Sequence, residues 1–318
     1  MTRGRGVLVA TLALLAAGCS SEPTYVGEAA PRDPDASLVT EPSATAELPT
    51  APPVDEQELE RTKQLVTLAA AAQEQAAKLN AQTSRIPPRD EPVLGADISW
   101  PQCPPGMGIE HKESSGQPMP TAEAEYVVIG LTNGPGFHAN PCLADQVAWA
   151  EEQGLLVSAY SVISWPDEAS QAQYGGLHEA GYAQAQFNLE SMRAAGLDSP
   201  VVWLDVEQVP HYEWTADVAA NAEVVLGAAQ GYLDAGYRVG VYSTPYIWES
   251  LVGDLSLGVP EWRAAGQTSR AEAEDRCGRD WVIQGGEAVL GQWVEDGRDK
   301  NVTCPGVEAD LGRWFTAA

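Results

Sequence analysis

Two acidic residues, Asp205 and Glu207, lie near the end of the apolar segment "VVWLDVEQV" (Val201–Val209). Burial of a charge without a partner is costly, so an acidic pair in a strand of this kind needs a reason. Residues two apart in a strand project from the same side, and like charges in a partly dry cleft raise the pKa of at least one of them. A protonated acid beside an ionised one is what glycoside cleavage requires. Solvated strand ends and a cation site are the alternatives.

Two further acids lie in apolar segments, Asp97 in "VLGADISW" (Val93–Trp100) and Asp310 in "VEADLGRWF" (Val307–Phe315). Arg313 is the single basic residue in the segments that carry these four acids, so a purely structural ion-pair network is poorly supported. We therefore expect the four acids to meet in a catalytic cleft.

Aromatic side chains could complete such a cleft. Tryptophan faces stack on the C–H surfaces of sugars, and Trp165 and Trp214 each follow a predicted strand. The four histidines are scattered, and no two of them have the spacing of metal ligands. We therefore expect neither a metal nor another cofactor.

The elements that must position these residues follow from the apolar pattern. Five segments are predicted to be strands: Val93–Trp100, Ala124–Gly134, Leu155–Ile163, Pro200–Val209 and Tyr237–Thr244. Three helices are predicted between them, each followed by a glycine: Cys142–Gln153, Gln171–Ala195 and Ala216–Ala235. Less regular apolar pieces follow at Pro260–Gly266, Ala288–Val294 and Val307–Phe315.

This alternation is typical of a parallel sheet and predicts an α/β fold with a TIM-like (β/α) barrel, which carries its chemistry at the C-terminal ends of the strands. An open, doubly wound sheet is the alternative, but no Gly-rich phosphate loop follows the first strand.

The N-terminal region predicts a lipid anchor. Arg3 and Arg5 precede the apolar run Val7–Ala17, which has the length of a signal-peptide core and is short for a membrane span. The following "LAAGC" resembles the bacterial lipobox, which implies cleavage before Cys19, lipidation of its thiol and retention at the outer face of the cytoplasmic membrane. An ordinary secretory signal is the alternative. We predict a lipoprotein signal peptide over 1–18, a disordered Pro/Ala/acidic tether over 19–53, a spacer helix over 54–85 and the barrel domain over 93–318.

Charge and cysteine content limit the partners and the compartment. The formal net charge of −27 argues against binding to nucleic acid. Beyond Cys19, an even number of cysteines in an extracytoplasmic chain favours two disulfides among three possible connectivities. We favour Cys103–Cys142 and Cys277–Cys304, which join near neighbours in sequence. A zinc site is the weaker interpretation, because no CxxC pair or histidine cluster accompanies the cysteines.

Four motifs resemble glycoside hydrolase family 25, the lysozyme-like muramidases: "GADISWPQC", "WLDVEQ", "GYRVGVYST" and "LGQWV…VEADLGRWF". They occur in the order and spacing of that family and cover roughly Leu94 to Phe315. The segments "DISWPQC" and "NPCL" (Asn140–Leu143) are more similar still to secreted actinobacterial relatives, whose shared cysteines fit the Cys103–Cys142 pairing. The resemblance implies an irregular barrel.

The resemblance also implies roles for the acids. Glu207 would protonate the leaving glycosidic oxygen, and Asp205 would orient the substrate's 2-acetamido group as it attacks the anomeric carbon. Asp97 and Asp310 would complete the acidic floor, and the hydroxyl of Tyr242 could reach the acetamido group. The chain departs from the family where Trp100 and Pro101 follow Ser99, in place of a histidine and a tryptophan.

The function that follows is a membrane-anchored extracytoplasmic glycosidase that cleaves N-acetylated cell-wall glycan (peptidoglycan). The alternative is a non-catalytic glycan-binding or envelope-organising lipoprotein on the same barrel. In either case, the partners of the protein would be the cell-wall glycan and, through lipid on Cys19, the membrane.

Overall fold

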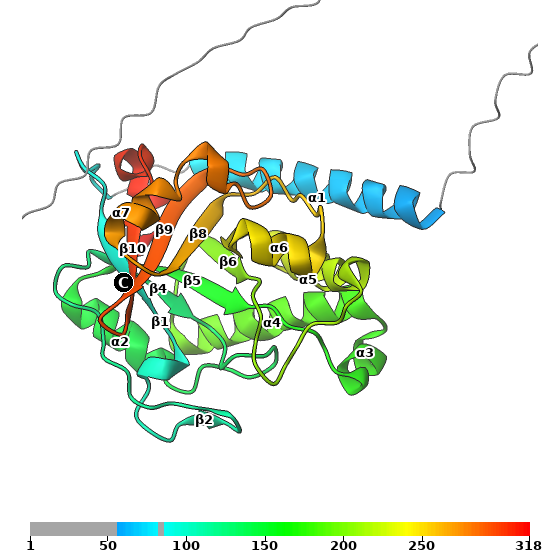
Figure 1. Cartoon of the computed structure of the whole chain (residues 1–318), viewed down its shortest axis with the longest axis horizontal. Helices are drawn as coiled ribbons and strands as arrows, with labels where there is room; N and C mark the ends of the chain where they lie inside the picture. Colours follow the sequence, from blue (N-terminus) through cyan, green and yellow to red (C-terminus); the bar gives the residue numbers. More distant parts are fainter. Residues whose placement is uncertain (1–55, 82–85) are drawn as a thin grey trace, which may run out of the picture. The chain divides into compact units, whose positions relative to one another are not determined.

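Eight strands close into a barrel in this structure, a computed structural model that describes residues 56–81 and 86–318 (Figure 1). The strand order is β5-β4-β1-β10-β9-β8-β7-β6, and the pairing of β5 with β6 closes the circle. All pairs are parallel except those that β10 makes with β1 and β9. The predicted α/β barrel, irregular in form, is therefore confirmed, and its closure rules out the open sheet.

The barrel strands are β1 (Leu94–Ile98), β4 (Tyr126–Gly130), β5 (Leu156–Val162), β6 (Val201–Asp205), β7 (Arg238–Ser243), β8 (Glu261–Gln267), β9 (Ala288–Glu295) and β10 (Arg298–Thr303). Short strands outside the circle are β2 (Gly108–Ile109), β3 (Lys112–Glu113) and β11 (Thr316–Ala317). The helices of the described residues are α1 (Glu56–Asn80), α2 (Leu143–Gln153), α3 (Glu168–Tyr174), α4 (Leu177–Ala195), α5 (Val218–Asp234), α6 (Pro245–Val252) and α7 (Arg270–Asp275). The 3₁₀ segments are η1 (Trp100–Gln102), η2 (Arg279–Trp281) and η3 (Val307–Arg313).

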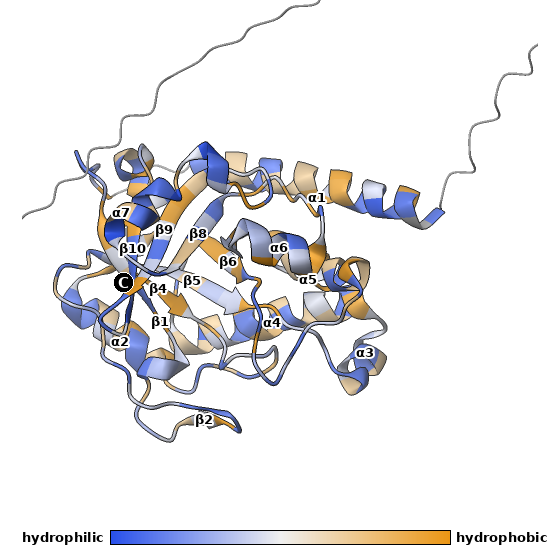
Figure 2. Cartoon of the chain, in the orientation of Figure 1, coloured by the Kyte–Doolittle hydropathy of each residue, from blue (hydrophilic) through white to orange (hydrophobic). Residues whose placement is uncertain are grey.

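Alternation along the strands sorts the core into two parts. Val202 and Leu204 of β6 pack in the cluster that the helices cover, whereas Val201 and Trp203 pack in a second, aromatic-rich cluster. Because side chains alternate between the two faces of a strand, the second set points into the barrel. In the hydropathy view, β4, β6 and β9 are largely hydrophobic and α7 is largely hydrophilic (Figure 2).

An aromatic floor fills the interior of the barrel. Its members are Tyr126, Trp203, Trp262, Trp314 and Phe315, each at most 1% exposed. The floor needs inward-facing glycines on neighbouring strands. A Cβ on Gly95 would lie 2.3 Å from the Tyr126 ring, and a Cβ on Gly240 would lie 2.3 Å from the Trp203 ring.

The helix α1 lies within the range predicted for a spacer helix, and it packs on the barrel domain. Leu68 is 2% exposed and belongs to the core that the other helices share. The side chain of Asn80 accepts a hydrogen bond of 2.8 Å from Arg238 at the start of β7, and Gln75 donates to the carbonyl of Gly236. The bond from Arg238 ties the C-terminal end of α1 to the N-terminal end of a barrel strand.

Both favoured disulfides are present, Cys103–Cys142 and Cys277–Cys304. No helix in the described part of the chain is long and apolar enough to cross a membrane. The predicted signal peptide, the tether and Cys19 lie outside the described residues.

Candidate active site

A cavity of about 570 Å³ opens where the parallel strands of the barrel end. Residues from the C-terminal ends of β1, β5, β6, β7, β8 and β9 line it, together with the start of the antiparallel strand β10. Four acids contribute to its wall: Asp97, Asp205, Glu207 and Asp299. This is the end of a barrel at which enzymes of this architecture place their chemistry.

Asp205 and Glu207 continue the inward-facing side of β6. They follow Val201 and Trp203 in steps of two, so their side chains reach the cavity directly above the aromatic floor. The backbone there is held on both sides. Tyr242 accepts from the Val206 amide (3.1 Å) through its carbonyl oxygen, and Trp214 donates from its indole to the Glu207 carbonyl (3.0 Å).

The apolar floor below the acids removes them from water and so favours their neutral forms. Burial raises the pKa of Asp205 well above its ordinary value, and the neighbouring charges of Glu207 and Asp97 add to the shift. Burial also raises the pKa of Glu207, against the opposing effect of the Lys112 ammonium. The Oδ1 atom of Asp205 is buried and has no hydrogen-bond partner among the described residues. Both carboxyls therefore favour their neutral forms more than exposed carboxyls do.

Asp97 faces the pair from β1. Its Oδ1 accepts a hydrogen bond of 2.7 Å from Asn301 of the adjacent strand β10. Burial, and then the charge of Asp299, raise the pKa of Asp97 well above its ordinary value. Asp299 accepts from Gln292 across the β9–β10 pair (3.4 Å), and burial raises its pKa too.

Asp299 is the fourth acid of the cavity, in the place predicted for Asp310. That prediction is wrong, because Asp310 lies in η3 and is exposed. It acts electrostatically on Arg238 at the first residue of β7, which is the opposite end of the barrel. The pattern that could have revealed Asp299 is the Asp296–Gly297 turn, which joins β9 to β10 and puts Asp299 near the start of the returning strand.

Of the three predicted substrate-binding aromatics, Tyr242 lines the cavity and donates from its hydroxyl to Gln292 Oε1 (3.3 Å). Trp165 and Trp214 do not line it. Trp214 is 8% exposed and packs in the helix-side core, and Trp165 packs partly against the same core. The tryptophans that do line the cavity are Trp100 in η1 and Trp281 in η2. The motif "DISWPQC" contains the first of these.

Lys112 is a cavity residue that no sequence pattern indicated. It lies on the β2–β3 hairpin, a segment without an apolar pattern, and it lines the same cavity as Asp205 and Glu207. Burial lowers the pKa of its ammonium, and the two carboxylates oppose that shift.

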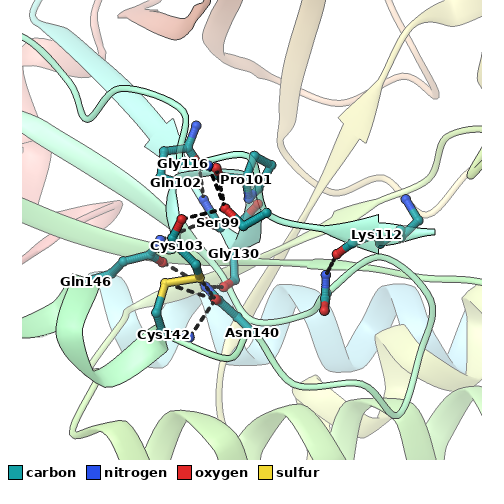
Figure 3. Close-up of a disulfide and its surroundings, with 12 residues drawn as sticks. Ser99, Pro101, Gln102, Cys103, Lys112, Gly116, Gly130, Asn140, Cys142 and Gln146 are labelled. Carbon is teal, nitrogen blue, oxygen red and sulfur yellow. Dashed lines mark hydrogen bonds between the residues drawn. A yellow bond between two sulfur atoms is a disulfide. The ribbon is translucent and has the colours of Figure 1, made fainter. Parts of the chain in front are cut away.

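The Cys103–Cys142 disulfide joins the end of η1 to the start of α2 (Figure 3). Trp100 of η1 lines the cavity. Beside the disulfide, Asn140 donates to the Gly130 carbonyl (2.8 Å) and to Gln146 Oε1 (2.7 Å). Gln146 in turn donates to the Ser99 carbonyl (2.6 Å). The segment after β1 is thus tied to β4 and α2 by a covalent bond and a buried amide network. No group of three or more His, Cys, Asp or Glu side chains in the described residues has the arrangement of a metal site.

Comparison with known proteins shows similarity to lysozyme-like proteins. The family model described as "Lysozyme-like protein 1" matches residues 133–275, a range that contains β5 to β8 and therefore Asp205, Glu207 and Tyr242. The chain is 36% identical over 73 residues to "Lysozyme-like protein 5" of Caenorhabditis elegans, covering 22% of this chain and 31% of that protein. It is 29% identical over 143 residues to "Probable GH family 25 lysozyme 3" of Dictyostelium discoideum, covering 44% and 27%.

The chain therefore spans less than a third of the length of these two curated relatives. Among solved structures, the bacterial lysozyme from Streptomyces coelicolor matches with a TM-score of 0.46 and 14% identity, covering 71% of this chain and 99% of that one. The resemblance that the sequence motifs indicate is confirmed: over this part, the chain is similar in sequence to lysozyme-like proteins, one of them named as a glycoside hydrolase family 25 lysozyme.

Proposed function

We propose that this protein is a glycoside hydrolase that cleaves N-acetylated cell-wall glycan, with Asp205 and Glu207 as its reacting centre. One observation carries the proposal. Two carboxyls with raised pKa values face one cavity at the catalytic end of the barrel, inside the range that matches the lysozyme-like family model.

In the proposed mechanism, Glu207 is the general acid. Burial raises the pKa of its carboxyl and so favours the protonated form, which gives its proton to the leaving glycosidic oxygen. The C–O bond to the leaving sugar then breaks. Water later attacks the anomeric carbon and returns a proton to Glu207, which restores the acid.

Asp205 orients and stabilises the 2-acetamido group, whose carbonyl oxygen attacks the anomeric carbon in the first step. A buried carboxyl with a free Oδ1 is suited to accept the acetamido N–H as positive charge develops on that group. Tyr242 lies opposite Asp205 on the neighbouring strand β7, and its hydroxyl turns from Gln292 to the acetamido group when substrate binds. Asp97 and Asp299 bind sugar hydroxyls in the cavity.

The test is release of new reducing ends from purified peptidoglycan. We expect Glu207→Gln to lower the rate by at least about 100-fold, the usual range for loss of a general acid, and the exposed Glu249→Gln to leave it unchanged. If the wild type and Glu207→Gln both release only background levels, the hydrolase proposal fails. Binding to the glycan without release would instead support a non-catalytic glycan-binding lipoprotein.

We also propose that the protein is held at the outer face of the cytoplasmic membrane by lipid on Cys19. The support is the "LAAGC" segment after the apolar run Val7–Ala17. Cells fed labelled fatty acid should incorporate the label into the wild type and not into Cys19→Ser. Equal labelling of the two proteins would exclude this anchor.

A further inference from the structure

Lys112 places a cation in a cavity whose other charged groups are mainly acids. Four carboxyls and two basic residues, Lys112 and Arg276, line the space. Arg276 is already ion-paired with Glu272 at 2.8 Å. Lys112 has no carboxylate within 4.0 Å of its ammonium among the residues described, although it lies close enough to Glu207 and Asp205 to affect their charge states. It is therefore available to an incoming anion.

The fold holds Lys112 in this position. The buried side chain of Asn133 accepts from the Ile109 amide (2.9 Å) and donates to the Lys112 carbonyl (3.0 Å), which staples the hairpin to the segment after β4. The Lys112 stem runs over Gly134, where a Cβ would lie 2.3 Å from Lys112 Cδ and the φ of +100° also favours glycine. The "TNG" segment after β4 thus positions a lysine from a different loop.

The ammonium is paired with an aromatic face. It lies 5.4 Å from the centre of the Trp100 ring, and both residues line the cavity. A sugar that entered the cavity beside Trp100 would bring its substituents close to Lys112. An ammonium in a half-buried site attracts a carboxylate more strongly than it would in water, because the local dielectric is lower.

We propose that Lys112 binds a carboxylate of the substrate, so that the cavity selects N-acetylated glycans that carry free acidic groups. The inference rests on the proposed function, because it takes the cavity as a glycan site. Without such a cation, a chain of net charge −27 with an acidic cavity would repel an anionic glycan. Lys112 thereby makes one subsite of the acidic cavity attract anions.

The carboxylate has two possible sources in a cell-wall polymer, the sugar itself or an attached peptide. Three substrates separate them: intact peptidoglycan, the glycan strand after removal of its peptides, and that stripped strand with its carboxylates converted to methyl esters. Preference for the stripped strand over its ester assigns the carboxylate to the sugar. The carboxylate belongs to the peptide if the protein binds the stripped strand and its ester equally well but binds intact peptidoglycan more tightly, and if that difference disappears without Lys112.

The experiment measures both binding and cleavage. Binding of soluble fragments of each substrate is measured in the Glu207→Gln background, with and without Lys112→Met, and kcat/KM is measured with Glu207 intact. We expect Lys112→Met to lower affinity for the acidic fragments about 10-fold, equivalent to about 1.4 kcal/mol, and to leave affinity for the esters unchanged. Lys112→Arg should retain the preference, and the exposed Lys63→Met removes an equal charge as the matched control.

Equal loss of affinity for acidic and esterified fragments in Lys112→Met would overturn the inference, since Lys112 would then act only on the acid pair. The inference would also be overturned if Lys63→Met abolished the preference for acidic over esterified fragments as fully as Lys112→Met does. Because binding is measured without cleavage, the Lys112 inference can succeed while hydrolysis fails, and hydrolysis can succeed while Lys112 shows no preference.

Discussion

Asp205 is a buried carboxyl with an unpartnered oxygen, 4% exposed and set above an aromatic floor. Such a group destabilises the fold in its charged form, and burial raises its pKa accordingly. The same environment suits the role that we propose for Asp205, because a dry carboxyl responds strongly to charge that develops on a bound sugar. Stability and activity should therefore oppose each other at this residue.

We expect Asp205→Asn to stabilise the protein at pH 7 while it removes activity. The amide has the same shape but carries no charge, and the gain in unfolding free energy should be on the order of 2 kcal/mol. Urea unfolding of the wild type, Asp205→Asn and the exposed control Asp254→Asn measures it. A variant that is less stable than the wild type would contradict the description of Asp205 as a strained buried acid.

Single residues differ in how far the sequence could reveal them. The steps of two from Val201 to Glu207 are enough to place both acids on one face. Lys112 could not be found in this way, because its position depends on Asn133 and Gly134, which lie more than twenty residues away in sequence and contact it only in the fold. Trp165 and Trp214 follow strands as expected, but the neighbouring sequence does not indicate that their rings pack into the core.

Among the elements, the segment after β1 depends most on a covalent bond. The Cys103–Cys142 disulfide and the network from Asn140 to Ser99 hold η1, and with it Trp100, against the cavity. These contacts link residues from three different elements, so the wall has little support from regular secondary structure.

We expect Cys103→Ser/Cys142→Ser to lose about 3 kcal/mol of unfolding free energy, the typical effect of removing a native disulfide. Because η1 carries Trp100, which lines the cavity of the proposed glycan site, the variant should also show a higher KM for glycan at temperatures where it remains folded. Thermal unfolding and steady-state kinetics measure the two effects. Unchanged Tm and KM would show that the amide network alone holds the wall.

Two elements near the C-terminus show where sequence patterns were misread. Val307, Leu311, Trp314 and Phe315 recur at steps of three and four, which is helical spacing, and the segment forms η3 with Asp310 on its exposed side. The last strand of the barrel along the chain is β10 instead, which pairs with β1 and follows the Asp296–Gly297 turn. The acid that this end of the chain contributes to the cavity is Asp299 of β10, and not Asp310.

For the molecule as a whole, the cavity acids should make stability depend on pH. The pKa values of Asp97 and Asp205 in the folded state lie above their ordinary values, so the folded state binds protons more tightly than the unfolded chain does. The stabilisation from these protons is complete below about pH 4 and is lost as the pH rises through the folded-state values.

The unfolding free energy of Asp97→Asn/Asp205→Asn should therefore exceed that of the wild type by an amount that is smallest near pH 4 and grows toward pH 7. The amide oxygen introduced at position 97 can still accept the bond from Asn301, which keeps the variant folded. Denaturant unfolding at several pH values gives the difference. A difference that is constant or shrinks as the pH rises would mean that these carboxyls are not protonated in the folded state.

The sequence pattern predicts most of the fold, because near-continuous apolar runs alternate with helices that end at glycines. In the structure, Gly154 and Gly196 take the left-handed backbone that ends α2 and α4. The antiparallel strand β10 and the β2–β3 hairpin were not predicted, since both are short and polar. These two elements supply Asp299 and Lys112, which distinguish this cavity from the acid pair alone.

Cleavage of glycosidic bonds in cell-wall glycan is the activity that we propose for the acidic cavity. The most direct measurement is mass spectrometry of soluble fragments that the wild type releases from purified peptidoglycan, after reduction of their new sugar ends with borohydride. We predict fragments that end in a reduced N-acetylated sugar, N-acetylmuramitol for a muramidase, and none above background with Glu207→Gln. Fragments with intact glycan and cut peptides, or equal release by Glu207→Gln, would contradict the account.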